Sequence, residues 1–97
     1  MPWTYILRCG DGTYYVGSTR DLERRMSEHY VGQGSVYTSK RLPVELVWCF
    51  ETSDVGTAWA LERRIHGWSR SKREALITGR FDLLPFLSRR RTSSADD

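Results

Sequence analysis

Five polar side chains of this 97-residue chain fall on or beside positions where an apolar face is predicted: Tyr5, Tyr15, Arg25, His29 and Glu62. A polar group on a buried face is costly unless it is hydrogen-bonded or paired, so such residues are candidates for chemistry. Two tyrosines, an arginine and one carboxylate gathered in one cleft suit the cleavage of a phosphodiester bond with a single hard cation.

That cleavage needs a deprotonated nucleophile, stabilisation of the charge at phosphorus and neutralisation of the leaving oxygen. Glu62 is the predicted ligand of one Mg²⁺ or Mn²⁺, an ion that takes one or two carboxylates and keeps most of its waters. No second carboxylate recurs on the predicted buried faces, so a two-metal site is not expected. Arg25 is the predicted phosphate partner. Tyr5, Tyr15 or His29 would accept or orient the water proton, although a tyrosine with a free pKa of ~10 needs a neighbouring cation for this.

The same residues also have purely structural interpretations. Tyr5 and Tyr15 are ordinary strand residues, and His29 can be a hydrogen-bonded core histidine. Glu62 can form a structural salt bridge with Arg25. The residues taken singly leave these alternatives open, and their order along the chain carries more information.

A β-hairpin is predicted to position both tyrosines. Its strands cover residues 3–9 and 13–18, joined by the turn Gly10-Asp11-Gly12. A three-residue loop pairs Tyr5 with Gly17 and Leu7 with Tyr15, which places the two tyrosines diagonally on one face. In that register Gly17 leaves open space opposite Tyr5.

A helix capped by Thr19 or Asp21 is predicted to run to about residue 30. Its apolar stripe consists of Leu22, Met26 and Tyr30. His29 lies within the stripe and Arg25 on its edge, whereas Arg24 points to solvent. We therefore expect Arg25, but not Arg24, to meet an anion beside the core.

The rest of the chain predicts one strand and two helices. Residues 32–35 read as a flexible loop, 36–38 as a short extended piece and 44–50 as a central strand buried on both faces. A helix over about 55–69, capped by Ser53 or Asp54, carries Glu62 near its stripe of Ala58, Leu61, Ile65 and Trp68. A capping box at Ser71-Lys72-Arg73-Glu74 predicts a third helix through about residue 78. An apolar segment 81–87 should complete one domain over 1–87, followed by a disordered Arg/Ser-rich tail, 88–97.

Charge and composition favour a polyanionic partner. The net charge is only +3, yet 13 of the 15 basic residues are Arg, whose planar fork matches phosphate oxygens. The predicted nucleic-acid contacts are Arg24, Lys40, Arg41, Arg70, Lys72 and Arg73. Cys9 and Cys49 are predicted to be reduced, buried thiols. The absence of a leader or a long apolar run predicts a cytoplasmic protein without a membrane span.

The order of these motifs resembles the GIY-YIG nuclease superfamily, in particular its small single-domain branch. Trp3-Thr4-Tyr5 stands where that family has Gly-Ile-Tyr, and Tyr15-Val16-Gly17 where it has Tyr-Ile-Gly. Residues 17–29 resemble its first helix, and 58–65 the helix with the metal-binding glutamate. Three further stretches of this chain resemble the small branch: Tyr37-Thr38, 43–47 and 69–77.

The resemblance implies an α+β fold, a small three-stranded antiparallel sheet flanked by helices. It implies a DNA endonuclease with one divalent cation, Mg²⁺ or Mn²⁺, among relatives that act in repair and on branched DNA. By similarity, Tyr5 and Tyr15 would flank the phosphate, Arg25 would bind it and Glu62 would hold the metal. Tyr15 or His29 would match the base.

Three departures from the family pattern accompany the resemblance. Trp3 replaces the first glycine, the chain contains no Asn where many relatives have one late in the domain, and a separate DNA-binding domain is not recognised. Targeting would then come from the domain itself, its arginines or a partner protein. An alternative is a catalytically weak nucleic-acid-binding or adaptor module on this scaffold. A protein-interaction domain with solvated arginines is a third possibility.

Overall fold

The computed structural model describes residues 1–79. The described residues divide into two units, 1–66 and 67–79. The predicted apolar segment 81–87 and the predicted tail 88–97 lie outside the described residues.

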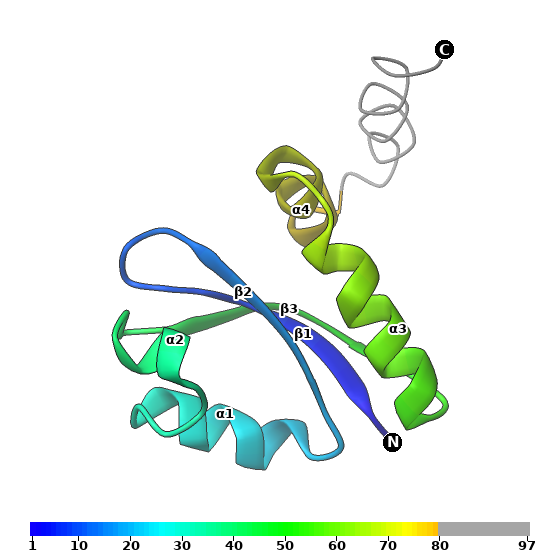
Figure 1. Cartoon of the computed structure of the whole chain (residues 1–97), viewed down its shortest axis with the longest axis horizontal. Helices are drawn as coiled ribbons and strands as arrows, with labels where there is room; N and C mark the ends of the chain where they lie inside the picture. The colour runs from blue at the N-terminus through cyan, green and yellow to red at the C-terminus, as the bar shows by residue number, and fades with distance from the viewer. Residues whose placement is uncertain (80–97) are drawn as a thin grey trace. The chain divides into compact units, whose positions relative to one another are not determined.

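The first unit is built on a three-stranded antiparallel sheet, as predicted (Figure 1). Its strands are β1 (Trp3–Arg8), β2 (Tyr14–Thr19) and β3 (Glu45–Glu51), in the order β2-β1-β3. The predicted hairpin register is confirmed, because Tyr5 pairs with Gly17 and Leu7 with Tyr15. Gly12 closes the turn at φ +86°, a left-handed conformation that glycine adopts without steric penalty.

The prediction of a central third strand was wrong. β1 is the central strand, and β3 pairs with β1 alone at the edge of the sheet. Within residues 1–79 no strand pairs with the other side of β3, and Phe50 and Cys49 are exposed despite the apolar run. Both cysteines are free thiols, but only Cys9 is buried as predicted. A continuous apolar stretch can therefore belong to an edge strand whose faces are only partly covered.

Helix α1 (Leu22–Tyr30) covers one face of the sheet, and the Asp21 carboxylate caps it by accepting a hydrogen bond from the Arg24 amide at 3.1 Å. The core on this face consists of Tyr5, Leu7, Cys9, Met26 and Val44. The predicted stripe is partly corrected, because Tyr30 is exposed and His29 is the buried residue at this end of the helix.

Residues Val36–Ser39 form a short helix, α2, where an extended piece was predicted. Ser35 caps it, because the Ser35 hydroxyl accepts a hydrogen bond from the Thr38 amide at 3.1 Å. The β-branched and aromatic residues suggested extension, but a capping serine and a buried Thr38 favour the helical turn.

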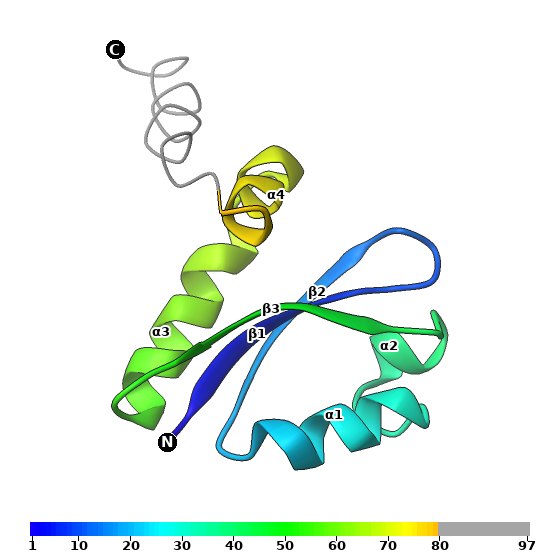
Figure 2. The same cartoon turned by 180° about the vertical axis from the view of Figure 1, so that it is seen from behind.

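Helix α3 (Val55–His66) covers the opposite face of the sheet (Figure 2). The Thr4 hydroxyl of β1 donates a hydrogen bond to the Ala58 carbonyl at 2.7 Å, and Ile65 is fully buried. The Asp54 carboxylate accepts a hydrogen bond from the Thr57 amide at 2.7 Å, so the predicted Asp54 cap is confirmed. The helix ends three residues earlier than predicted.

The second unit contains helix α4 (Arg70–Ile77). Its cap is Ser69, whose hydroxyl accepts from the Lys72 amide at 3.2 Å, so the predicted capping box beginning at Ser71 was wrong by two residues. Both serines satisfy the composition rule for a cap, and the backbone path decides between them. None of the helices in residues 1–79 is long and apolar enough to cross a bilayer.

Candidate active site

Tyr5 of β1 and His29 of α1 form a buried hydrogen-bonded pair. The Tyr5 Oη atom lies 2.9 Å from His29 Nε2, and the two rings meet edge to face with centroids 5.7 Å apart. Tyr5 is 1% exposed and His29 0%. Neither side chain is placed to meet solvent directly, so any part they play in catalysis would pass through a more exposed neighbour.

The space opposite Tyr5 at Gly17 is filled by the Tyr5 ring itself. A Cβ atom at residue 17 would lie 2.6 Å from Tyr5 Oη and 2.7 Å from Cζ. The space predicted to be open beside Gly17 is therefore occupied by the Tyr5 side chain. Glycine is needed here because of this close approach, and its backbone conformation is an ordinary one.

Replacing Gly17 with Ala is expected to lower the free energy of unfolding by about 1–3 kcal/mol, because the buried Tyr5 ring has to shift. Urea unfolding followed by circular dichroism measures this change. Gly56→Ala in α3 is the matched control, since a Cβ there meets only the Asp54 carboxylate, at 3.3 Å. A control as damaging as Gly17→Ala would refute the steric explanation.

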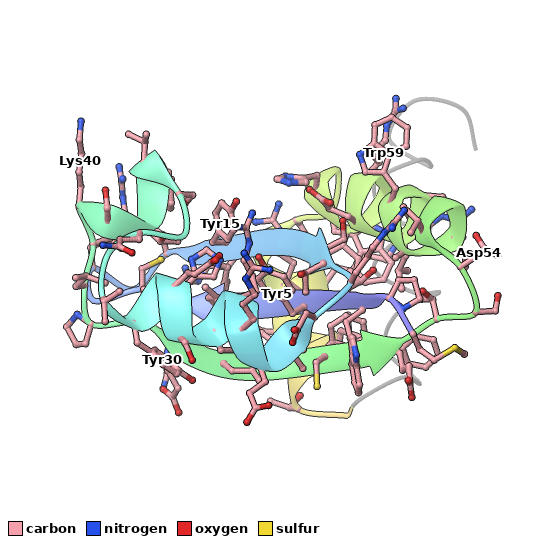
Figure 3. All side chains as sticks on the ribbon, turned by 90° about the horizontal axis from the view of Figure 1, so that it is seen from below. Tyr5, Tyr15, Tyr30, Lys40, Asp54 and Trp59 are labelled. Atoms are coloured by element: carbon pink, nitrogen blue, oxygen red, sulfur yellow. The ribbon has the colours of Figure 1, made fainter. Side chains whose placement is uncertain are left out.

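Tyr15 of β2 is the more accessible of the two tyrosines. It is half-buried, its ring meets His29 edge to face at 5.5 Å, and it stacks on Tyr37 of α2 at 5.9 Å. Figure 3 shows Tyr15 and Tyr5 near the middle of the sheet. Of the predicted proton-handling residues, Tyr15 is the one placed to meet a substrate or a water.

Arg25 points from α1 toward the tyrosine pair, with its side chain 36% exposed. Its Nη1 atom donates to Glu28 Oε1 at 3.0 Å, while its Nε atom is buried and has no hydrogen-bond partner within the described residues. The expected anion is thus partly supplied by Glu28, which is not among the predicted site residues although its i,i+3 spacing from Arg25 signals a pair. The alternative of an Arg25–Glu62 salt bridge is not found.

A pocket of about 230 Å³ opens beside Arg25. It is lined by Thr19, Arg20, Asp21, Arg24, Arg25 and Glu28. Three guanidinium groups around two carboxylates leave an excess of positive charge, and the unpaired Arg25 Nε adds an unused donor. Such a pocket suits an oxyanion of phosphate size. A larger pocket of about 700 Å³ lies on the other side of α1 and contains none of the five predicted site residues.

Burial dominates the protonation of the tyrosine–histidine pair. It raises the pKa of Tyr5 to about 12, against the smaller effect of the neighbouring Arg25 guanidinium, which lowers it. Burial, followed by the charge of Arg25, lowers the pKa of His29. At neutral pH Tyr5 is therefore protonated and His29 uncharged. The expectation that a neighbouring cation would turn this tyrosine into a base does not hold for Tyr5 at rest.

Glu62 reaches the same region from the opposite face of the sheet. The Ser18 hydroxyl donates to Glu62 Oε1 at 2.6 Å, and Ser18 directly follows Gly17, the partner of Tyr5. Side chains alternate along β2, so Ser18 faces α3 while Gly17 faces α1. The carboxylate also acts on Tyr5 electrostatically and raises its pKa slightly. The candidate site therefore straddles the edge strand β2.

The donor set around Glu62 fits a single hard cation rather than a metal cluster. Its side chain is 21% exposed, and Oε2 lies 3.6 Å from His66 Nε2. Within residues 1–79 no group of three or more His, Cys, Asp or Glu side chains converges. One accessible carboxylate suits an ion that keeps most of its waters. Ser18 and His66 were not selected from the sequence, although His66 lies at i+4 from Glu62.

The predicted nucleic-acid contacts differ in accessibility. In the first unit Arg24 is 77% exposed as predicted, Lys40 is exposed, and Arg41 is held by Asp11 at 3.1 Å. In the second unit Arg70 pairs with Glu74, and Arg73 is partly buried. Lys72 is only 7% exposed, with its ammonium 4.3 Å from the centroid of the Trp68 ring. Arg24 and Lys40 are therefore the best placed for phosphate contact.

The comparisons with known proteins all point to one protein family. A model described as the GIY-YIG catalytic domain matches residues 1–75. A UPF0213 protein of Halobacterium salinarum is 42% identical over 77 residues, which cover 79% of this chain and 100% of that protein. A UPF0213 protein of Vibrio cholerae is 39% identical over 80 residues, covering 80% and 79%.

The structural comparison agrees with the sequence matches. The solution NMR structure of a UPF0213 protein from Bacillus halodurans is similar with a TM-score of 0.53 and 37% sequence identity, covering 80% of this chain and 84% of that chain. The matched region includes the three strands, α1 and α3, and thus all five predicted site residues. The GIY-YIG domain is a nuclease-type catalytic domain. By its sequence match and its three-stranded sheet, this chain belongs to the GIY-YIG family.

Proposed function

We propose that this protein is an endonuclease that hydrolyses DNA phosphodiester bonds with one divalent cation, Mg²⁺ or Mn²⁺. The observation that carries the proposal is the convergence at β2 of the Arg25 guanidinium, the Tyr5–His29 pair with Tyr15, and the Glu62 carboxylate. These groups come from four separate elements. Core packing alone does not require an arginine with an unpaired buried Nε among them.

In the proposed mechanism Arg25 binds the scissile phosphate. Its free Nε–H donates a hydrogen bond to a phosphate oxygen that sits in the pocket beside it, and the charge that develops at phosphorus strengthens the contact. Glu28 holds the guanidinium in place through Nη1. Arg20 and Arg24 line the same pocket and add sequence-independent attraction for the DNA backbone.

Proton handling is assigned to Tyr15, with the Tyr5–His29 pair behind it. Tyr15 is half-buried and accessible, so it orients the attacking water and takes part in removing its proton. His29 is uncharged at neutral pH and bonded to Tyr5, which makes it an acceptor for a proton passed inward. Glu62 would hold the metal ion, which when bound would stabilise charge on the phosphoryl and leaving oxygens.

We propose more specifically that the DNA substrate is branched or damaged, as for other nucleases of repair.

An alternative is a nucleic-acid-binding module with weak or no turnover. It is favoured by the lack of any Asn in the sequence and by the ion pair of Arg25 with Glu28, which occupies one nitrogen of the guanidinium. In that case a partner protein would supply the catalytic or targeting function.

Incubation of the purified protein with nicked, flapped and branched DNA tests the proposal. We expect cleavage that requires Mg²⁺ or Mn²⁺, stops with a chelator and is lost in Arg25→Ala and Glu62→Ala. An RNA of the same sequence tests the choice of nucleic acid. Cleavage no greater than in those two variants would overturn the nuclease. Salt-sensitive binding that Glu62→Ala leaves unchanged would then establish the binding module.

A further inference from the structure

Two adjacent residues of the short helix α2, Tyr37 and Thr38, contact different side chains of the candidate site. The Thr38 Oγ1 atom lies 3.0 Å from His29 Nδ1, and the Tyr37 ring stacks on Tyr15 with an interplanar angle of 24°. Neither residue was predicted to belong to the site. Resting on the proposed function, we propose that Thr38 and Tyr37 are positioning residues for the nuclease reaction: Thr38 sets the tautomer of His29, and Tyr37 sets the ring plane of Tyr15.

The hydrogen-bond network around His29 determines its tautomer. Within the described residues Tyr5 Oη has one hydrogen-bond partner, His29 Nε2, and the neighbouring Arg25 guanidinium can only donate. A buried phenol O–H needs an acceptor, and within the described residues that acceptor is His29 Nε2. The imidazole proton is therefore assigned to Nδ1, which donates to Thr38 Oγ1.

Thr38 Oγ1 can accept a hydrogen bond from His29 Nδ1–H because the Thr38 hydroxyl can donate its own proton to an acceptor of Ser35. Its Oγ1 atom lies 2.9 Å from Ser35 Oγ and 3.4 Å from the Ser35 carbonyl oxygen. The hydroxyl proton thus points toward Ser35, and the lone pair points toward His29. The result is a directed chain from Tyr5 through His29 and Thr38 to Ser35. This chain leaves Nε2 as the acceptor that faces Tyr5.

The segment before α2 is shaped around the same imidazole. A Cβ atom at Gly34 would overlap the His29 ring, so only glycine fits. Ser35 caps α2 and so fixes where Thr38 stands. Thr38 and His29 are both fully buried, which excludes competing water from the bond between them.

Tyr37 is held by contacts to its ring and to its hydroxyl. The Tyr37 ring stacks on Tyr15, and the Arg41 guanidinium carbon lies 3.7 Å from the centroid of the Tyr37 ring. The Tyr37 hydroxyl donates to Thr13 Oγ1 at 2.8 Å, beside the hairpin turn. Arg41 is itself fixed by Asp11 of that turn at 3.1 Å. The Tyr37 side chain therefore connects α2 to the hairpin, and its fixed ring restricts the orientation of the Tyr15 ring.

Nitrogen-15 NMR of the imidazole rings tests Thr38 without relying on activity. The chain has two histidines, and His29→Gln identifies the signals of the buried one. We expect His29 in the unmodified protein to carry its proton on Nδ1. Thr38→Ser should keep this tautomer, whereas Thr38→Val should shift it toward Nε2–H or a mixture. A proton found on Nε2 in the unmodified protein, or a tautomer that Thr38→Val does not move, would overturn the assignment.

Single-turnover cleavage supplies the second readout. Thr38→Val should slow cleavage on the order of 10- to 100-fold with unchanged DNA affinity, as for other groups that orient a reacting side chain. Thr38→Ser should restore most of the rate. Tyr37→Leu removes the stacking and should slow the reaction, whereas Tyr37→Phe keeps the stacked ring, loses only the hydrogen bond to Thr13 and should slow the reaction less than Tyr37→Leu. Equal rates for Leu and Phe at residue 37 would refute the role of Tyr37.

The two failures are distinguishable. If the unmodified protein does not cleave DNA, the proposed function fails, and the NMR result still decides whether Thr38 sets the His29 tautomer. If the protein cleaves DNA and neither the tautomer nor the rate responds to Thr38→Val, the positioning role fails and the nuclease stands. Thermal unfolding of each variant identifies losses that are due only to instability.

Discussion

Replacing Glu62 with Gln is expected to lower metal-dependent cleavage on the order of 10³-fold. The amide keeps an oxygen that can accept from Ser18, so the local geometry should survive while the charge that binds the cation is lost. A bound cation contributes several kcal/mol of stabilisation to the transition state, and each 1.4 kcal/mol changes the rate about tenfold. Single-turnover rates over a Mn²⁺ titration measure the effect.

Glu51→Gln is the control for this experiment. Glu51 is an exposed carboxylate at the end of β3, which β1 separates from β2, and its replacement should leave the rate and the Mn²⁺ dependence unchanged. The proposed metal ligand would be wrong if Glu62→Gln required the same Mn²⁺ concentration and cut at the same rate as the unmodified protein.

Replacing Arg25 with Ala is expected to slow cleavage about 10²- to 10³-fold, the usual cost of removing a preorganised donor to a developing oxyanion. Arg25→Lys should recover little of the rate. An ammonium group cannot contact Glu28 and a phosphate oxygen in the planar, forked manner of a guanidinium. Rates measured at saturating DNA separate this loss from a loss of affinity.

Arg24→Ala provides a matched control from the neighbouring residue. Arg24 is exposed and its Nε lies 3.5 Å from Glu28 Oε2, so its loss should weaken DNA binding at low salt with little effect on the bound rate. The two adjacent arginines thus separate general attraction from contact with the reacting phosphate. Similar losses of rate in both variants would contradict this division.

Much of the candidate site could be predicted because its positions follow from local periodicity. A three-residue turn and the period of two along a strand place Tyr5 opposite Gly17 and on the same face as Tyr15. The 100° step of a helix separates Arg24 from Arg25 and turns His29 inward. These rules act over a few residues, and the structure agrees with them at these positions, although Tyr30 of the same predicted stripe is exposed.

The features that were not predicted depend on contacts between distant segments. The apolar run of β3 predicts a central strand, but strand order depends on pairing between distant segments, and β1 pairs with both β2 and β3. Residues 36–38 were read as extended, yet α2 forms because Thr38 is buried against His29. The cap of α4 is Ser69 rather than Ser71, because the backbone is extended at Ser69 and the helix begins at Arg70.

The sequence by itself determined which side chains could share a site, because a tyrosine pair, an inward arginine and a lone glutamate are set by types and spacings. The tertiary structure alone decided how these groups behave. Burial raises the pKa of Tyr5 to about 12 and leaves His29 uncharged, Glu28 takes one nitrogen of Arg25, and Glu62 approaches β2 from the far face. Protonation and pairing depend on desolvation and distance between segments remote in sequence, and those quantities exist only once the chain has folded.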